Sequence, residues 1–147
     1  MRLKTNLIIA LTALLLGVQA QATGVWPGVI GLWRTAGDEG LIRIEACGEA
    51  ICGRIAEAAG DAPAQTDARN PDPALRARPI AGLLIMKLKR LAPGRWGEGF
   101  IYNPDNGRSY RASIDLTGDG SLRLRGCLVA PLCRTQTWTR VGRLAER

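Results

Sequence analysis

The stretch RSYRASIDLTGDGSLRLRGCL, residues 108–128, decides the fold. Two runs of alternating apolar and polar residues, Arg108 to Leu116 and Ser121 to Leu128, flank the turn Gly118-Asp119-Gly120. Alternation with a period of two is typical of half-buried β-strands, and a short Gly-Asp-Gly turn between two such runs predicts a β-hairpin. The stretch therefore predicts an antiparallel β-sheet protein.

The same pattern continues on both sides of this hairpin, with almost no helical periodicity. Asp105-Asn106-Gly107 marks a second tight turn. The expected strands are Gly31 to Thr35, Gly40 to Cys47, Ile51 to Ala58, Ile80 to Arg90, Trp96 to Asn103, Arg108 to Leu116, Ser121 to Leu128 and Arg134 to Val141. Since closure of such a meander removes its exposed strand edges, we predict an all-β fold, an antiparallel up-and-down eight-stranded β-barrel.

One connection is too long for a meander of tight turns. From Ala59 to Pro79 the chain is rich in Ala, Pro, Asp, Asn and Arg, and loops of this length are usually functional or disordered. Asp72 followed by Pro73 is typical of an N-cap and the first position of a helix, so we predict one short helical turn within the long loop.

The first twenty residues are expected to form a cleaved signal peptide. Arg2 and Lys4 precede the apolar run Leu7 to Val18, and Val18-Gln19-Ala20 offers small residues at the cleavage positions. The run of about twelve residues is shorter than the ~20 needed to span a bilayer, so we expect no transmembrane protein. We predict residues 1–20 as signal peptide and 21–147 as one barrel domain of an exported protein, periplasmic or secreted.

Composition narrows the function classes further. The chain holds 20 Lys and Arg against 13 Asp and Glu, and no His. The absence of His excludes Ser-His-Asp and Cys-His nucleophilic sites. The basic excess favours an anionic partner such as anionic lipid, whereas export and the lack of a basic run beyond Lys87-Leu88-Lys89-Arg90 make nucleic acid an unsuitable one.

The four cysteines are Cys47, Cys52, Cys127 and Cys133. In an exported protein an even number of cysteines favours disulfides. The spacing suggests one bridge between Cys47 and Cys52 and another between Cys127 and Cys133. A zinc site made from all four thiolates is the alternative, although the gaps of four and five residues fit poorly with the usual ligand spacing.

Two features, Gly31-Leu32-Trp33 and Arg140, resemble the lipocalin and wider calycin barrels. The resemblance implies a structural pair in which Trp33 sits at the closed end of the barrel and Arg140 lies over its ring.

Five segments, of which Gly31-Leu32-Trp33 is the first, occur in the order found in a family of small exported bacterial proteins, the domain of unknown function 2147 family, which the chain resembles. They are Gly31-Leu32-Trp33, CGEAICGRI (47–55), DARNPDPALRARPIAGL (67–83), GFIYNPDNGRSY (99–110) and RTQTWTR (134–140). This resemblance implies a lipocalin-like barrel and export, and it carries no established activity.

The last strand has an unusual inward face. Arg134, Gln136, Trp138 and Arg140 share one parity, which places two cations where a barrel normally buries hydrocarbon. A buried arginine needs either an internal acid, for which Glu98 is the candidate, or an anionic ligand group. The expected ligand-binding residues are Arg134, Gln136, Trp138, Tyr110, Arg76, Arg78, Asp67 and Asn70. Alternatively, Asn70 and Asp72, which precede prolines, only shape turns of the long loop, and the loop arginines fold back onto them.

Our leading hypothesis is a non-catalytic barrel that binds a small apolar or amphipathic ligand. Its expected aliphatic wall consists of Ile42, Ile44, Leu84, Met86, Ile114, Leu122 and Leu124. The alternative is an envelope protein-interaction module with a filled barrel, which would dock through the loop from Ala59 to Pro79. An enzyme using Asp67 and Glu98 lacks any spacing that defines an acid and base pair, so we expect no catalytic residue, no cofactor and no metal.

Overall fold

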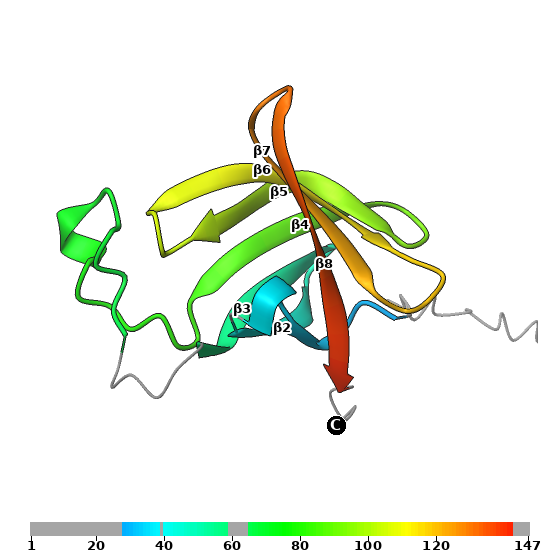
Figure 1. Ribbon diagram of the computed structural model, residues 1–147, viewed down its shortest axis with the longest axis horizontal. Helices are drawn as coiled ribbons and strands as arrows, with labels where there is room; N and C mark the ends of the chain where they lie inside the picture. Colours follow the sequence, from blue (N-terminus) through cyan, green and yellow to red (C-terminus); the bar gives the residue numbers. More distant parts are fainter. Residues whose placement is uncertain (1–27, 39, 59–64, 143–147) are drawn as a thin grey trace, which may run out of the picture.

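The computed structural model describes residues 28–38, 40–58 and 65–142. They form a closed antiparallel barrel in which each strand pairs with the next and β8 pairs with β1 (Figure 1). The strands are β1 (Gly31–Arg34), β2 (Gly40–Cys47), β3 (Ala50–Ala58), β4 (Leu84–Ala92), β5 (Arg95–Asn103), β6 (Arg108–Leu116), β7 (Leu122–Val129) and β8 (Leu132–Gly142). The eight-stranded up-and-down barrel predicted from the alternation is therefore confirmed.

Two short 3-10 turns interrupt the strands, η1 (Ala36–Asp38) and η2 (Pro73–Leu75). At η2 the Asp72 side chain accepts a 2.9 Å hydrogen bond from the backbone N–H of Ala74, as an N-cap does. The predicted helical turn in the long loop is thus present. The predicted signal peptide, residues 1–20, lies outside the described residues, and no helix within the described ranges is long and apolar enough to cross a membrane.

The inward face of β5 differs from the prediction. A β-bulge between Trp96 and Gly99 inserts an extra residue, and Glu98 takes a positive φ of 49° there. The bulge reverses the parity of the rest of the strand, so that Ile101 pairs with Tyr110 and packs against the core. The prediction that Glu98 points inward as a partner for an arginine is wrong, because its carboxylate is exposed and lies 3.7 Å from Lys89 Nζ.

Large side chains fill one end of the barrel completely. This closed end lies near the β4–β5 and β6–β7 turns, and its fully buried residues are Trp33, Ile44, Ile51, Met86, Leu88, Trp96, Ile114 and Leu122. Close packing of this kind excludes water and supplies most of the favourable free energy of folding of a small barrel. The other end of the barrel is packed less completely.

Trp33 and Arg140 close the seam between β1 and β8. They are register partners, and the guanidinium carbon of Arg140 lies 4.2 Å from the centroid of the Trp33 ring. The Trp33 indole N–H donates to the Val29 carbonyl at 2.8 Å, and Arg140 Nη1 donates to the Ile30 carbonyl at 3.1 Å. The contact implied by the resemblance to calycin barrels is present.

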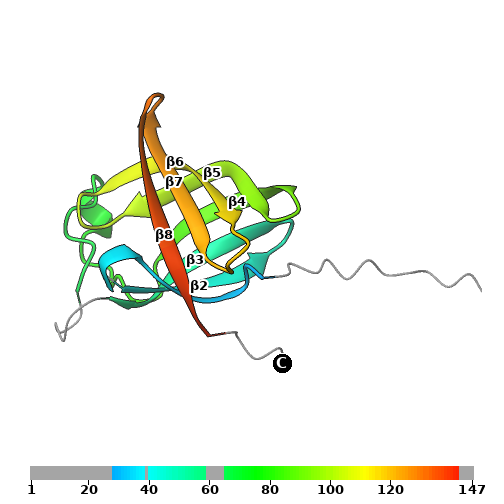
Figure 2. The same cartoon turned by 45° about the vertical axis from the view of Figure 1, so that its right-hand side comes forward.

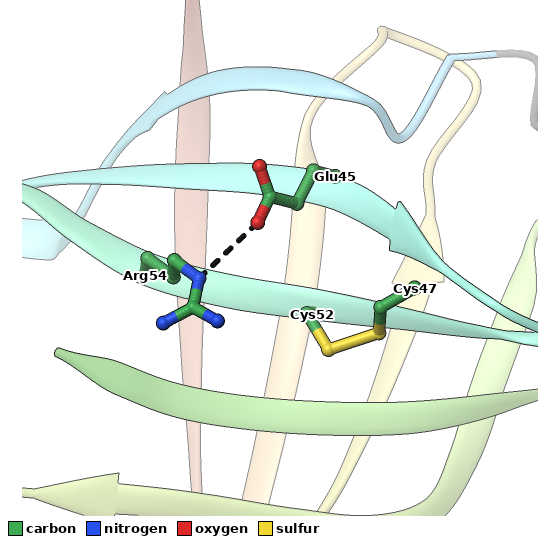
Figure 3. The surroundings of a disulfide bond; sticks show 4 residues. All are labelled: Glu45, Cys47, Cys52 and Arg54. Carbon is green, nitrogen blue, oxygen red and sulfur yellow. Dashed lines mark hydrogen bonds and ion pairs between the residues drawn. A yellow bond between two sulfur atoms is a disulfide. The ribbon is translucent and has the colours of Figure 1, made fainter. Parts of the chain in front are cut away.

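Both local disulfides are formed, Cys47 with Cys52 and Cys127 with Cys133. The first joins the ends of β2 and β3, beside an exposed ion pair in which Arg54 Nε lies 3.2 Å from Glu45 Oε1 (Figure 3). Because all four cysteines are oxidised, none is left as a thiolate ligand for zinc.

The disulfide between Cys47 and Cys52 should contribute about 2 kcal/mol to the free energy of unfolding, the value expected for so short a loop. We expect the double substitution Cys47→Ser and Cys52→Ser to lower the urea midpoint accordingly and to leave the barrel folded. Glu45→Gln, which removes the neighbouring exposed ion pair, is the control and should change stability by less than about 0.5 kcal/mol. Equal effects of both changes would contradict this assignment.

Candidate ligand-binding cavity

A cavity of about 750 Å³ occupies the end of the barrel opposite the closed end. Its mouth is bordered by the β1–β2 connection, by Gln65 and Ile80 of the long loop, by the β5–β6 turn and by the start of β8. Pockets that hold small molecules commonly measure about 300–1,000 Å³. The barrel is therefore hollow at this end, and the filled barrel of the interaction-module alternative does not match the structure.

The deeper wall of the cavity is aliphatic. It is formed by Ile42, Ile55, Ile80, Ile85, Ile101 and Leu124. Of the predicted wall, Ile42 and Leu124 line the cavity, whereas Ile44, Met86, Ile114 and Leu122 belong to the packed closed end. Leu84 does not line it, because a bulge between Gly53 and Arg54 changes the register with β4 and Ile85 is buried in its place.

Gly126 on β7 makes part of this wall without a side chain. A Cβ added there would lie 3.6 Å from Tyr110 Cβ and 3.7 Å from Ile101 Cγ2, which is ordinary van der Waals contact. The backbone thus tolerates a side chain at this position, and a larger one would enter the cavity. The missing side chain leaves space for a ligand.

Four predicted site residues come together in the cavity: Tyr110, Arg134, Gln136 and Trp138. Register explains this, since Gln136 pairs with Leu124 and Arg134 pairs with Gly126. The Tyr110 hydroxyl accepts a 2.8 Å hydrogen bond from Asn106 Nδ2, and Gln136 Oε1 accepts a 3.3 Å hydrogen bond from the Trp138 indole N–H. In each case the oxygen is used as an acceptor, which leaves the Tyr110 O–H and the Gln136 amide N–H groups to donate to a ligand.

Arg134 is the cation of this group. Its side chain is exposed at the mouth, and within the described part of the chain its guanidinium has no hydrogen-bond or ion-pair partner. Asp105 also lines the mouth but is not paired with it. An arginine beside hydrocarbon, with other donors nearby, is an arrangement suited to carboxylate, phosphate or sulfonate groups.

The other four predicted site residues form a separate cluster in the long loop. Asp67 is fully buried, and its carboxylate accepts hydrogen bonds from Tyr102 Oη at 2.5 Å, Asn70 Nδ2 at 2.7 Å and Arg78 Nη2 and Nε at 2.7 and 3.0 Å. Arg76 Nε donates to the Asn70 carbonyl at 2.8 Å. The loop arginines thus fold back onto the loop itself, and these residues do not line the cavity.

Burial by itself would raise the pKa of Asp67, but the hydrogen bonds from Tyr102, Asn70 and Arg78 outweigh it and hold that pKa below its usual value. For Tyr102, burial and the adjacent Asp67 carboxylate raise the pKa of the phenol. Asp67 is therefore a charged acceptor that ties the loop to β5. The same loop places Gln65 and Ile80 at the cavity mouth. These two residues are paired, since the Ile80 N–H donates to the Gln65 carbonyl.

Several residues that line the cavity were not predicted from the sequence. Gln65 and Ile80 lie on either side of the cluster around Asp67, and only the fold brings them to the mouth. Gly126 carries a detectable signal, because it occupies an inward position of β7 between Leu124 and Leu128 where a large side chain is expected.

The closed eight-stranded barrel with a cavity at one end defines a lipocalin-like barrel. It is similar to the solved structure of a protein from the human pathogen Helicobacter pylori that is described as belonging to the lipocalin family, with a TM-score of 0.70 and 19% sequence identity over 77% of this chain and 82% of that one. At this identity the likeness concerns the fold. No curated protein sequence matches the chain.

The chain belongs to the family described as "Uncharacterized protein conserved in bacteria (DUF2147)", whose family model matches residues 31–140. That range runs from the start of β1 to the arginine that stacks on Trp33, so it covers all eight strands except the last two residues of β8. The resemblance noted from the five sequence segments is confirmed.

Proposed function

We propose that this protein is an exported, non-catalytic carrier of a small amphipathic molecule with an acidic group. The observation that carries the proposal is Arg134, which has no partner among the described residues and lies at the mouth of a cavity whose deeper wall is aliphatic. The predicted leader over residues 1–20 and the two disulfides support export, because disulfides persist in oxidising compartments.

In this proposal the apolar part of the ligand lies against the isoleucines and Leu124, where its transfer from water is favoured by roughly 25 cal/mol per Å² buried. The acidic group lies at the mouth, where Arg134, Gln136 and Tyr110 donate to it. Trp138 packs beside it. Asp67, Asn70, Arg76 and Arg78 act indirectly, by holding the loop that positions Gln65 and Ile80.

The proposal can be tested with two dyes that share an aromatic body and differ in one charged group. 1-Anilinonaphthalene-8-sulfonate carries a sulfonate, and N-phenyl-1-naphthylamine lacks it. We expect Arg134→Gln to weaken binding of the sulfonate dye about tenfold, equal to ~1.4 kcal/mol, because one charge-assisted contact is lost. The neutral dye should bind the variant as it binds the wild type.

The matched control is Arg123→Gln, which removes an exposed arginine of β7 that does not line the cavity. It should leave both dissociation constants unchanged in a fluorescence titration. The proposal fails if Arg134→Gln affects both dyes equally, or if Arg123→Gln has the same effect as Arg134→Gln.

A further inference from the structure

The tip of the β7–β8 hairpin exposes a cluster of apolar side chains. Leu128, Val129 and Leu132 are 51, 60 and 65% exposed, and Ala130 and Pro131 between them are also exposed. We call residues 128–132 the apolar tip. The hairpin projects beyond the neighbouring strands in both views of the barrel (Figures 1 and 2). Five consecutive exposed apolar residues on a projection are typical of an interaction site rather than of ordinary surface.

The base of the tip is held in place before any partner binds. The disulfide between Cys127 and Cys133 joins the two strands directly beneath it, and Val129 pairs with Leu132 across the turn. Arg125 Nη2 lies over this base, 3.4 Å from Cys133 Sγ. A segment held in this way loses little conformational freedom on binding, so more of the contact energy appears as affinity.

The hairpin that carries the apolar tip has charges of one sign. Residues 121–142, which contain the whole hairpin, include Arg123, Arg125, Arg134 and Arg140 and no acidic residue. Arg140 stacks on the Trp33 ring at the far end of β8. Arg125 and Arg134 flank the tip, and within the described ranges neither forms an ion pair. An apolar tip with cations behind it complements a surface that is apolar inside and anionic outside.

We infer that the apolar tip inserts into the interface of an anionic phospholipid bilayer, with Arg125 and Arg134 at the level of the lipid phosphates. Apolar side chains in the interface and basic residues at an anionic surface both favour such binding. A protein groove would accept the apolar residues but gives no reason for a hairpin that contains arginines and no acid.

Docking in this orientation has a geometric consequence. Leu132 and Arg134 belong both to the region of the apolar tip and to the cavity lining, so insertion of the tip turns the cavity mouth toward the bilayer. The inference does not depend on the cavity being occupied, because Leu128, Val129 and Arg125 are outside its lining.

The test is co-sedimentation of the mature chain with vesicles of equimolar phosphatidylcholine and phosphatidylglycerol, and with vesicles of phosphatidylcholine alone. We expect binding to the mixed vesicles that weakens with added salt, and little binding to the neutral ones. Val129→Asp should weaken binding to the mixed vesicles about tenfold, because it removes an apolar anchor and adds a charge that the surface repels.

Val141→Asp is the matched control, since Val141 is 48% exposed on β8 and lies at the end of the strand away from the apolar tip. It should bind vesicles as the wild type does. An unchanged circular dichroism spectrum and an unchanged thermal unfolding midpoint show that each variant is folded. The inference is overturned if the wild type does not bind the mixed vesicles, or if both variants bind them equally. It is also overturned if size-exclusion chromatography finds a dimer that Val129→Asp dissociates and that does not bind vesicles.

Discussion

Replacing Asp67 by asparagine should lower the midpoint of thermal unfolding by roughly 10 °C, because the free energy of unfolding falls by about 3 kcal/mol. The Asp67 carboxylate is fully buried and accepts four hydrogen bonds. Asparagine keeps the shape but loses the charge and directs an N–H group at a donor. The Arg78 side chain is 36% exposed and can turn to solvent, which keeps the loss below that of a fully buried ion pair.

The effect of Asp67→Asn should depend on pH in a defined direction. The pKa of Asp67 is lowered in the folded protein from its ordinary 3.8, so the carboxylate contributes its full stability above that value. As the pH falls through the lowered pKa, the wild type binds a proton at Asp67 and loses this contribution. The difference in stability between wild type and variant should therefore be full at neutral pH and shrink below about pH 4.

The control for Asp67→Asn is the same substitution at Asp72 in the same loop. Asp72 is exposed and caps η2 through its side-chain oxygen, and asparagine caps helices about as well as aspartate. Asp72→Asn should therefore leave the unfolding midpoint nearly unchanged. Our description of the cluster around Asp67 would be contradicted if the two variants unfolded at the same temperature.

Gly126→Leu should abolish binding of both dyes, with a dissociation constant at least about a hundredfold higher, because the new side chain occupies the space that a ligand needs. The Cβ meets only ordinary contacts at Tyr110 and Ile101, so the barrel should fold with unchanged or slightly higher stability. The measurement is a fluorescence titration of each variant beside its thermal unfolding curve.

Gly142→Leu is the matched control for Gly126→Leu. Gly142 ends β8, and a Cβ added there has no atom within 4 Å. It should bind both dyes as the wild type does. If Gly126→Leu folds and still binds the neutral dye normally, the dye occupies some other place and the cavity is not the site.

The fold could be predicted because the strongest signals are local. Alternation over residues 108–128 marks β6 and β7, and Asp72 before Pro73 marks η2. The wrong predictions also have local causes. One extra residue at Glu98 reverses which residues of β5 face inward, and nothing in the alternation of that strand signals the bulge.

The site residues also differ in whether the sequence predicts them. Arg134, Gln136 and Trp138 follow from the parity of one regular strand, and the structure places all three on the cavity. The cluster around Asp67 depends instead on Tyr102, which is 35 residues further along the chain and follows the bulge within β5. A loop that folds across a strand leaves no periodic pattern, so its hydrogen bonds could not be predicted from spacing.

The measurement that tests the central claim most directly is a calorimetric titration of the wild-type protein with 1-anilinonaphthalene-8-sulfonate. Our account predicts saturable binding of one dye per barrel at micromolar concentration, with heat that disappears in Gly126→Leu. It would be contradicted if the folded wild type showed no saturable binding, or if Gly126→Leu bound the dye as tightly as the wild type does.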